Sequence, residues 1–351
     1  MASNATEAVF ELNNRFLTES SVFAALEADH RPKGFLSEES FRINIVMYRA
    51  LCSCINVSGL IANILNMIVY WKMGFSTTAN ISLFTLALSD FMQSLFLLSI
   101  ALFHGIYTEV ERLRLSVGVI TYLLNPVFWS VSAFGSWVTA TISVERCVSV
   151  ALPMKARLIF TRRSSTGLIL GMILYQVALL IPIYMNYEIK RVSSTVDNVT
   201  TIYTELHTIS LQQIGRLWFI SFSLPTFLCF FTIAVGTLLL VIKLRQTVVA
   251  RSSMAPGSRS SVNTNRETKI VRVVIMVSTI YICCMSPSVA FYATSFVVPT
   301  FNVNDPYYRS LAWLILITGF TMQSVSCSVN IFIYLTLSKK YKETIVALFT
   351  S

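Results

Sequence analysis

Residues 217–242 read LWFISFSLPTFLCFFTIAVGTLLLVI, and no charged residue lies between Arg216 and Lys243. The hydrocarbon layer of a bilayer is about 30 Å thick, so a helix that crosses it needs roughly 20 apolar residues. The stretch is a continuous apolar run and lacks the alternation of apolar and polar residues that marks a transmembrane β-strand. It therefore predicts a membrane-spanning helix.

The same pattern occurs seven times along the chain. Overall, 54% of the residues are hydrophobic and only 13% are charged, whereas soluble domains carry about 25% charged residues. This composition excludes a single water-soluble domain, a coiled coil and a disordered chain. The predicted fold class is an all-α membrane protein, a bundle of seven transmembrane helices. The predicted spans are 46–71, 78–104, 116–149, 166–187, 213–243, 270–298 and 310–336.

The distribution of lysine and arginine predicts an extracellular N-terminus. In that orientation the cytoplasmic side holds 16 of the 27 basic residues and a net charge of +13, whereas the outer side carries −2. An excess of basic residues on the cytoplasmic side is the rule for membrane proteins. The overall charge of +10 is therefore an orientation signal and implies no nucleic-acid partner.

The chain divides into three predicted parts. Residues 1–45 form an extracellular tail rather than a removed signal peptide, and residues 46–336 form the transmembrane domain. Residues 337–351 form a short cytoplasmic helix whose basic and apolar faces predict that it lies on the inner leaflet of the bilayer. Asn4 and Asn198 begin glycosylation sequons on the outer side.

Two polar residues interrupt the predicted spans at mid-depth, Asn63 in the first and Asp90 in the second. An aspartate at a helix centre costs about 2.5–3.5 kcal/mol on insertion scales, so its presence needs an explanation. One interpretation is a buried polar node that holds a sodium ion or a proton. The alternative is a structural hydrogen-bond cluster. The scattered histidines and cysteines predict no metal site and no other cofactor.

Further signals lie at the ends and bends of the spans. Glu145 and Arg146 end the third span, and Glu267 near the start of the sixth is predicted to pair with Arg146 across the cytoplasmic face. A proline inside a helix removes a hydrogen bond and predicts a kink. Pro225 in the fifth span and Pro287 in the sixth are such prolines. Near the end of the seventh span, Asn330 and Tyr334 are polar residues within an apolar run.

Taken in order, these residues resemble the motifs of the rhodopsin-like family of G protein-coupled receptors, over about residues 44–349. Asn63 is similar to the asparagine of the first helix, and Leu86–Asp90 to the LAxxD motif of the second. Glu145-Arg146-Cys147 resembles the Asp/Glu-Arg-Tyr motif, and Asn330–Tyr334 the Asn-Pro-x-x-Tyr motif. The chain departs from the family at several motif positions, where it carries Cys147, Met285 and Ile331.

The resemblance implies a plasma-membrane receptor whose partners are an extracellular small-molecule or peptide ligand and a heterotrimeric G protein. Phe128 stands where amine receptors carry an aspartate, and Ser324 where opsins attach retinal, which disfavours amines and light. The implied switch for G-protein coupling, driven by outward movement of helix six about Pro287, comprises Glu145, Arg146, Glu267, Asn330 and Tyr334. By helical position, the ligand pocket is expected to comprise Asn125, Phe128, Trp129, Tyr292, Phe320 and Gln323.

Three short stretches, Asn80–Leu83, Val144–Cys147 and Ala151–Lys155, look more like those of molluscan chemosensory receptors. This resemblance favours a chemosensory ligand, and a neuropeptide receptor is the alternative. Asp90 is the only acidic residue deep in a span, so the paired groups that intramembrane catalysis needs are missing and no enzyme is predicted. A small-solute transporter or channel is a more distant alternative, disfavoured because no internal repeat is visible.

Overall fold

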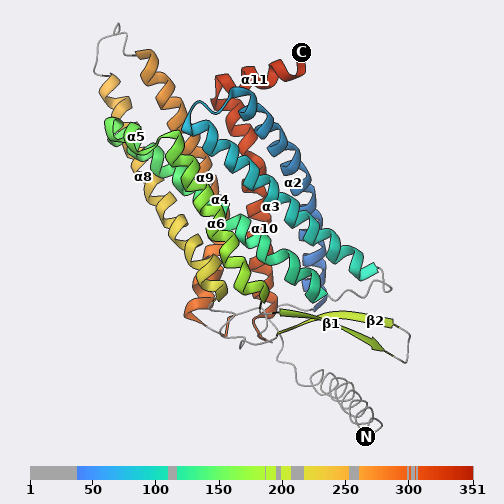
Figure 1. Ribbon diagram of the computed structural model, residues 1–351. Coiled ribbons are helices and arrows are strands. Elements are labelled where there is room, and N and C mark those ends of the chain that lie inside the picture. The colour runs from blue at the N-terminus through green and yellow to red at the C-terminus, as the bar shows by residue number, and fades with distance from the viewer. Residues whose placement is uncertain are drawn as a thin grey trace.

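The computed structural model describes residues 38–109, 117–185, 187–194, 199–206, 217–252, 261–298, 300–301, 305 and 307–350. Among these residues, seven helices are long and apolar enough to cross a membrane, which confirms the predicted seven-helix bundle (Figure 1). The helices that contain the spans are α2 (Glu38–Met73), α3 (Thr78–Glu109), α4 (Val117–Ala151), α6 (Arg162–Met185), α8 (Leu224–Ser252), α9 (Ser261–Val297) and α10 (Arg309–Leu337).

Two helices begin well before their predicted spans. Helix α2 starts at Glu38 rather than near residue 46, and α9 starts at Ser261 rather than near residue 270. An apolar run marks only the part of a helix that lies in hydrocarbon. The helix itself continues until a residue breaks it, and neither segment contains a proline or glycine. The predicted boundary between tail and transmembrane domain therefore falls inside α2.

A glycine ends the first spanning helix. Gly74 has a φ of 76°, a left-handed conformation that favours glycine because it has no Cβ. Its N–H donates to the carbonyl oxygen of Trp71 at 3.0 Å, and its own carbonyl oxygen accepts from Asn80 Nδ2 at 2.7 Å. These bonds close the short connection to α3.

A β-hairpin follows α6 and was not predicted from the sequence. Strand β1 (Tyr187–Ser194) pairs antiparallel with β2 (Val199–Leu206), and Tyr187 lies opposite Leu206. The signal that identifies it is the content of valine, isoleucine, threonine and tyrosine in β2, since these residues favour strands. Figure 1 shows the hairpin at one end of the bundle and the C-terminal helix α11 at the other.

Two short helices lie at the α11 end of the bundle. Helix α5 (Pro153–Ile159) begins with a proline, which needs no hydrogen-bond acceptor in the first turn. Helix α11 (Lys339–Thr350) begins after Ser338, whose backbone is extended and whose Oγ accepts the N–H of Tyr341 at 3.3 Å. A short C-terminal helix is therefore confirmed.

Helix α4 lies at the centre of the bundle. It packs against α3, α6, α8 and α9, and α10 packs against α2, α3 and α9. Large apolar side chains cover much of the outer surface, for example Leu174 on α6 and Leu238 on α8, as expected for helices surrounded by lipid. Polar side chains gather instead between α3, α4, α9 and α10, where the candidate site lies.

Candidate functional site

The buried carboxylate of Asp90 joins α3 to α10. Its Oδ2 accepts a hydrogen bond from Asn330 Nδ2 at 2.8 Å, and both side chains are buried. Asn63, the other residue of the predicted polar node, lies on α2 and donates to the carbonyl oxygen of Cys327 at 3.0 Å. Cys327 and Asn330 lie about one turn apart. Asn63 and Asp90 therefore hold the same segment of α10.

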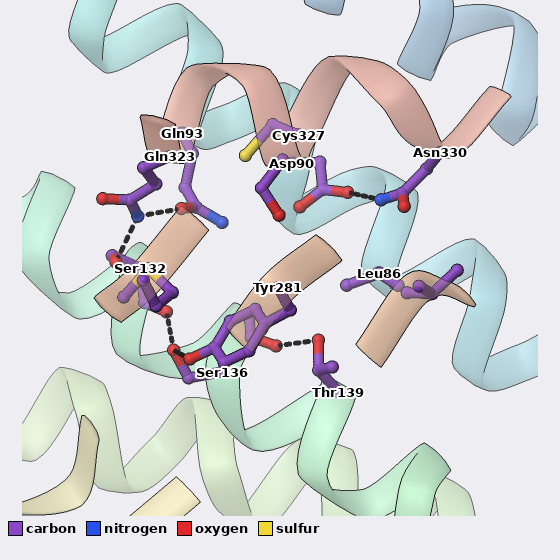
Figure 2. Close-up of a pocket in the computed structure, with 14 residues that line it drawn as sticks. Leu86, Asp90, Gln93, Ser132, Ser136, Thr139, Tyr281, Gln323, Cys327 and Asn330 are labelled. Carbon is purple, nitrogen blue, oxygen red and sulfur yellow. Dashed lines mark hydrogen bonds between the residues drawn. The ribbon is translucent and has the colours of Figure 1, made fainter. Parts of the chain in front are cut away.

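A small cavity of about 20 Å³ lies beside Asp90, between α3, α4, α9 and α10 (Figure 2). A space of this size holds one water-sized occupant. Carboxylate, amide and hydroxyl groups form much of its wall. The polar residues that line it include Asp90, Gln93, Ser132, Thr139, Ser326 and Asn330.

The oxygen atoms that line this cavity are suitable ligands for a small hard cation. Asp90 supplies anionic oxygen, and Thr139 and Ser326 supply hydroxyl oxygens, the ligand type that hard cations prefer. In the described part of the chain, this cavity included, no group of three or more His, Cys, Asp or Glu side chains could hold a metal ion. A cation in this cavity would therefore rest on one carboxylate and several neutral oxygens.

Three amide and hydroxyl side chains, here called the amide cluster, close one end of the cavity. Gln323 Nε2 on α10 donates to Gln93 Oε1 on α3 and to Ser132 Oγ on α4, each at 2.5 Å. A Cβ atom at Gly135 would lie 2.7 Å from Gln93 Nε2. Glycine at this position therefore makes room for the amide cluster between α3 and α4.

A tyrosine hydroxyl joins α9 to α4 across the same cavity. Tyr281 Oη donates to Ser136 Oγ at 2.7 Å, and Figure 2 shows the two side chains pointing toward each other. Ser136 Oγ donates in turn to the carbonyl oxygen of Ser132 at 3.0 Å, next to the amide cluster. A movement of α9 away from α4 would break the bond between Tyr281 and Ser136.

At the α11 end of α4, Arg146 is held by its neighbour in the sequence. Arg146 Nη2 lies 2.9 Å from Glu145 Oε1, which also accepts a hydrogen bond from the Thr78 hydroxyl of α3 at 2.6 Å. Glu145 is buried, whereas the Arg146 side chain is 15% exposed. The described partner of Arg146 is therefore Glu145.

Three of the predicted residues lie wholly or partly outside the described residues. Asn4 and Asn198 belong to segments that are not described, and the predicted sequons stay predictions. The backbone of Glu267 belongs to α9, but its side chain lies outside the described part. The predicted pair between Glu267 and Arg146 therefore also stays a prediction.

Tyr334 packs in a cluster of three tyrosines at the junction of α2, α10 and α11. The ring centroids of Tyr70, Tyr334 and Tyr341 lie 5.5–5.6 Å from one another. Tyr341 Oη donates to Asn66 Oδ1 at 2.5 Å, and Asn66 Nδ2 donates to Asn63 Oδ1 at 3.1 Å. Burial raises the pKa of Tyr341, so its phenol stays a neutral donor. Helix α11 is thereby tied to Asn63.

Four of the six predicted pocket residues form one aromatic cluster in the half of the bundle nearer the hairpin. We call this cluster the aromatic box; it consists of Phe128, Trp129, Tyr292 and Phe320. Its neighbouring ring centroids lie 5.4–5.8 Å apart. Asn125 lies about one turn nearer the hairpin on α4, and Gln323 lies one turn deeper on α10, in the amide cluster.

The predicted kink sites lie in two different settings. Pro287 lies inside α9, and Pro225 is the second residue of α8, which directly follows the π-helical turn η1 (Phe219–Ser223). A wider turn is one way to accommodate backbone groups that a proline leaves without a partner. Two further prolines lie inside helices and were not predicted as kink sites, Pro126 in α4 and Pro182 in α6.

Sequence reasoning missed most of the polar contacts around the cavity. Gln93 follows Asp90 by three residues and so shares its helix face, a signal that was present in the sequence. Ser132, Ser136 and Tyr281 carry no such signal, because serine and tyrosine are common in membrane helices. Only the packing of α3, α4 and α9 reveals that they meet.

The family model for the 7 transmembrane receptor (rhodopsin family) matches residues 62–334, which includes Asn63, the cavity and Tyr334. No curated protein matches the chain.

Proposed function

The chain belongs to the rhodopsin family of seven-transmembrane receptors, and we propose that it binds an extracellular ligand and activates a heterotrimeric G protein. It is a multi-pass membrane protein, and receptors of this family generally have such partners. The proposed location is the plasma membrane, with the N-terminus outside and α11 on the inner leaflet. This orientation rests on the net charge of +13 on the side that holds Arg146.

The observation that carries the proposal is the Arg146–Glu145 pair at the cytoplasmic end of α4. A nearly buried arginine held 2.9 Å from a carboxylate can be released when the helices around it separate. Ligand binding favours a state in which α9 swings outward about Pro287. Arg146 then faces a groove that accepts a terminal helix of the G protein, a helix-in-groove contact.

Several contacts share the restraint on α9 and α10. A shift from 1:99 to 99:1 needs about 5.5 kcal/mol of differential ligand binding, and a single neutral hydrogen bond contributes about 1 kcal/mol. One pair of residues therefore cannot hold the inactive state. The Arg146–Glu145 pair holds the guanidinium within α4, and the contacts that join helices are Tyr281–Ser136, Asp90–Asn330 and the tyrosine cluster.

Glu145→Gln should raise ligand-independent signalling. The amide keeps an acceptor for Thr78 but loses the charge that holds Arg146, and the pair lies 2.9 Å apart. The measurement is basal second-messenger output in cells at matched surface expression. Thr78→Val is the companion variant, because it removes only the hydrogen bond to Glu145. Basal output in Glu145→Gln equal to that of the native receptor would show that the pair does not restrain the inactive state.

Tyr281→Phe should also raise basal signalling, by about fivefold, since it removes one hydrogen bond worth about 1 kcal/mol between α9 and α4. Ser136→Ala removes the same bond and should have the same effect, and the double variant should add little. Tyr175→Phe is the matched control, because Tyr175 is exposed on the outer surface of α6. Fully additive effects of the two substitutions would mean that this bond is not the restraint.

The Glu267 side chain is proposed as a second partner of Arg146 in the inactive state. Glu267→Ala then raises basal signalling, and an unchanged basal output at equal expression counts against this pair. The cavity beside Asp90 is proposed to hold a sodium ion, because its volume fits one small occupant and its walls carry oxygen ligands.

The ligand is proposed to be a chemosensory cue, in line with the resemblance of three short stretches to molluscan chemosensory receptors. A neuropeptide receptor is the second candidate. The two differ in where the transcript occurs: sensory epithelium supports the first and central ganglia the second. Ligand-dependent GTP exchange on a G protein separates both from a small-solute transporter or channel.

A further inference from the structure

The aromatic box brings together rings from three helices. Phe128 and Trp129 lie on α4, Tyr292 on α9 and Phe320 on α10. The Trp129 ring contacts all three others, with centroids 5.4 Å from Phe128, 5.7 Å from Phe320 and 5.8 Å from Tyr292. Because α9 moves in the proposed activation, an occupant placed among these rings would couple directly to that helix.

One polar atom in the aromatic box lacks a partner. The hydroxyl of Tyr292 is buried, and no hydrogen-bond partner is found for it in the described part of the protein. Its ring neighbours are Trp129, Phe227 and Phe291. A buried hydroxyl without a partner destabilises a protein, and native structures contain few of them. The unpaired hydroxyl therefore indicates a partner that the described residues do not supply.

The walls around the aromatic box carry no full charge. The described residues 123–136, 217–231, 284–297 and 310–324 include no Asp, Glu, Lys, Arg or His. A charged ligand entering between these helices would lose its hydration and gain no counter-charge. A neutral ligand avoids this cost.

The ring contacts also select for an aromatic ligand. Trp129 contacts the other three rings and Phe128 contacts Phe320, so a ligand must part some of these ring contacts to enter. An aromatic ligand replaces each lost ring contact with another of the same kind, whereas an aliphatic ligand of equal size does not. The amide cluster lies one turn deeper, and both protons of the Gln323 amide are already used by Gln93 and Ser132. This floor limits the depth that the ligand can reach.

We infer that the receptor recognises a small, neutral aromatic molecule that carries a hydrogen-bond acceptor for Tyr292 Oη. This inference rests on the proposed function, because it takes the ligand to enter from the hairpin end between α4, α9 and α10. It selects a ligand class that excludes protonated amines, carboxylates and peptides whose recognition depends on a charged side chain.

Binding of four matched compounds to the purified receptor in lipid nanodiscs tests the inference. Acetophenone is the neutral aromatic acceptor, cyclohexyl methyl ketone lacks the aromatic ring, 1-phenylethylamine is cationic and benzoate is anionic. Acetophenone should bind at least tenfold more tightly than each of the others. Absence of acetophenone binding, or equal affinity for any of the other three, would overturn the inference.

Tyr292→Phe tests the role of the hydroxyl. It should weaken acetophenone binding about three- to tenfold, the effect of one hydrogen bond, whereas Tyr307→Phe, at a tyrosine that is 47% exposed, should not. Without ligand, Tyr292→Phe should unfold at the same or a higher temperature than the native receptor, because it removes an unpaired polar atom. A lower unfolding temperature would show that the hydroxyl has a protein partner, and the inference would fail.

Failure of this inference can be told apart from failure of the proposed function. GTP exchange by Tyr281→Phe needs no ligand and is measured in parallel with the binding experiments. If that exchange is accelerated but acetophenone does not bind, the protein is a G-protein-coupled receptor whose ligand belongs to another class. If neither occurs, both the ligand class and the coupling are wrong.

Discussion

Replacing Arg146 with alanine should abolish activation of the G protein, with at least a tenfold loss, while the receptor still reaches the cell surface. The guanidinium is held by Glu145, its neighbour on the same helix, so its removal breaks no described hydrogen bond between helices. In the active state it is proposed to face the groove that receives the G protein, where charge-assisted hydrogen bonds are strong. Second-messenger output and surface expression are measured in the same cells.

The matched control for this variant is Arg163→Ala. Arg163 is an exposed arginine in the first turn of α6, on the same side of the bundle, and its loss removes one positive charge without touching Glu145. Its signalling should equal that of the native receptor. Undiminished signalling in Arg146→Ala, or an equal loss in both variants, would remove Arg146 from the proposed switch.

Asp90→Ala should lower both the unfolding temperature and the amount of receptor at the surface. The substitution leaves Asn330 without its acceptor in the bundle interior and removes one of the hydrogen bonds that join α3 to α10. An unsatisfied buried group of this kind costs about 1–3 kcal/mol. Thermal unfolding of the purified receptor measures the change. An unfolding temperature equal to that of the native receptor would show that the Asp90–Asn330 bond does not stabilise the bundle.

Asp90→Asn separates the hydrogen bond from the charge. Its side-chain oxygen can still accept from Asn330, so most of the stability should be kept. The amide cannot neutralise a cation in the adjacent cavity. Replacing choline chloride with sodium chloride should therefore raise the unfolding temperature of the native receptor but not that of Asp90→Asn. An equal rise in both would place sodium elsewhere or make its effect nonspecific.

The bundle could be predicted from the sequence because each span is a long apolar run that is bounded by charged or polar residues. Asp90, Asn330 and Arg146 could also be singled out, since a charged or amide group in such a run is conspicuous. The hydrogen-bond partners around the cavity could not be predicted in this way. The bond between Tyr281 and Ser136 joins residues 145 positions apart in the sequence, and neither residue type is unusual in a membrane helix.

The aromatic box and the Arg146–Glu145 pair show other limits of prediction from the sequence. Helical position was sufficient to group Phe128, Trp129, Tyr292 and Phe320, but it could not place Gln323 one layer deeper, in contact with Gln93. Charge alone suggested Glu267 as the partner of Arg146. The partner that the structure describes is Glu145, although adjacent residues of a helix generally point in different directions. The 2.9 Å contact forms because the long arginine side chain reaches back to the buried carboxylate.

The measurement that tests the central proposal most directly is GTP exchange by purified heterotrimeric G proteins, one of each Gα class, with the receptor in lipid nanodiscs. Two variants are compared, Tyr281→Phe and Tyr281→Phe combined with Arg146→Ala. The proposal predicts that the first accelerates exchange on at least one class several-fold over empty nanodiscs, and that the second does not. No acceleration on any class, or acceleration that survives the loss of Arg146, would contradict it.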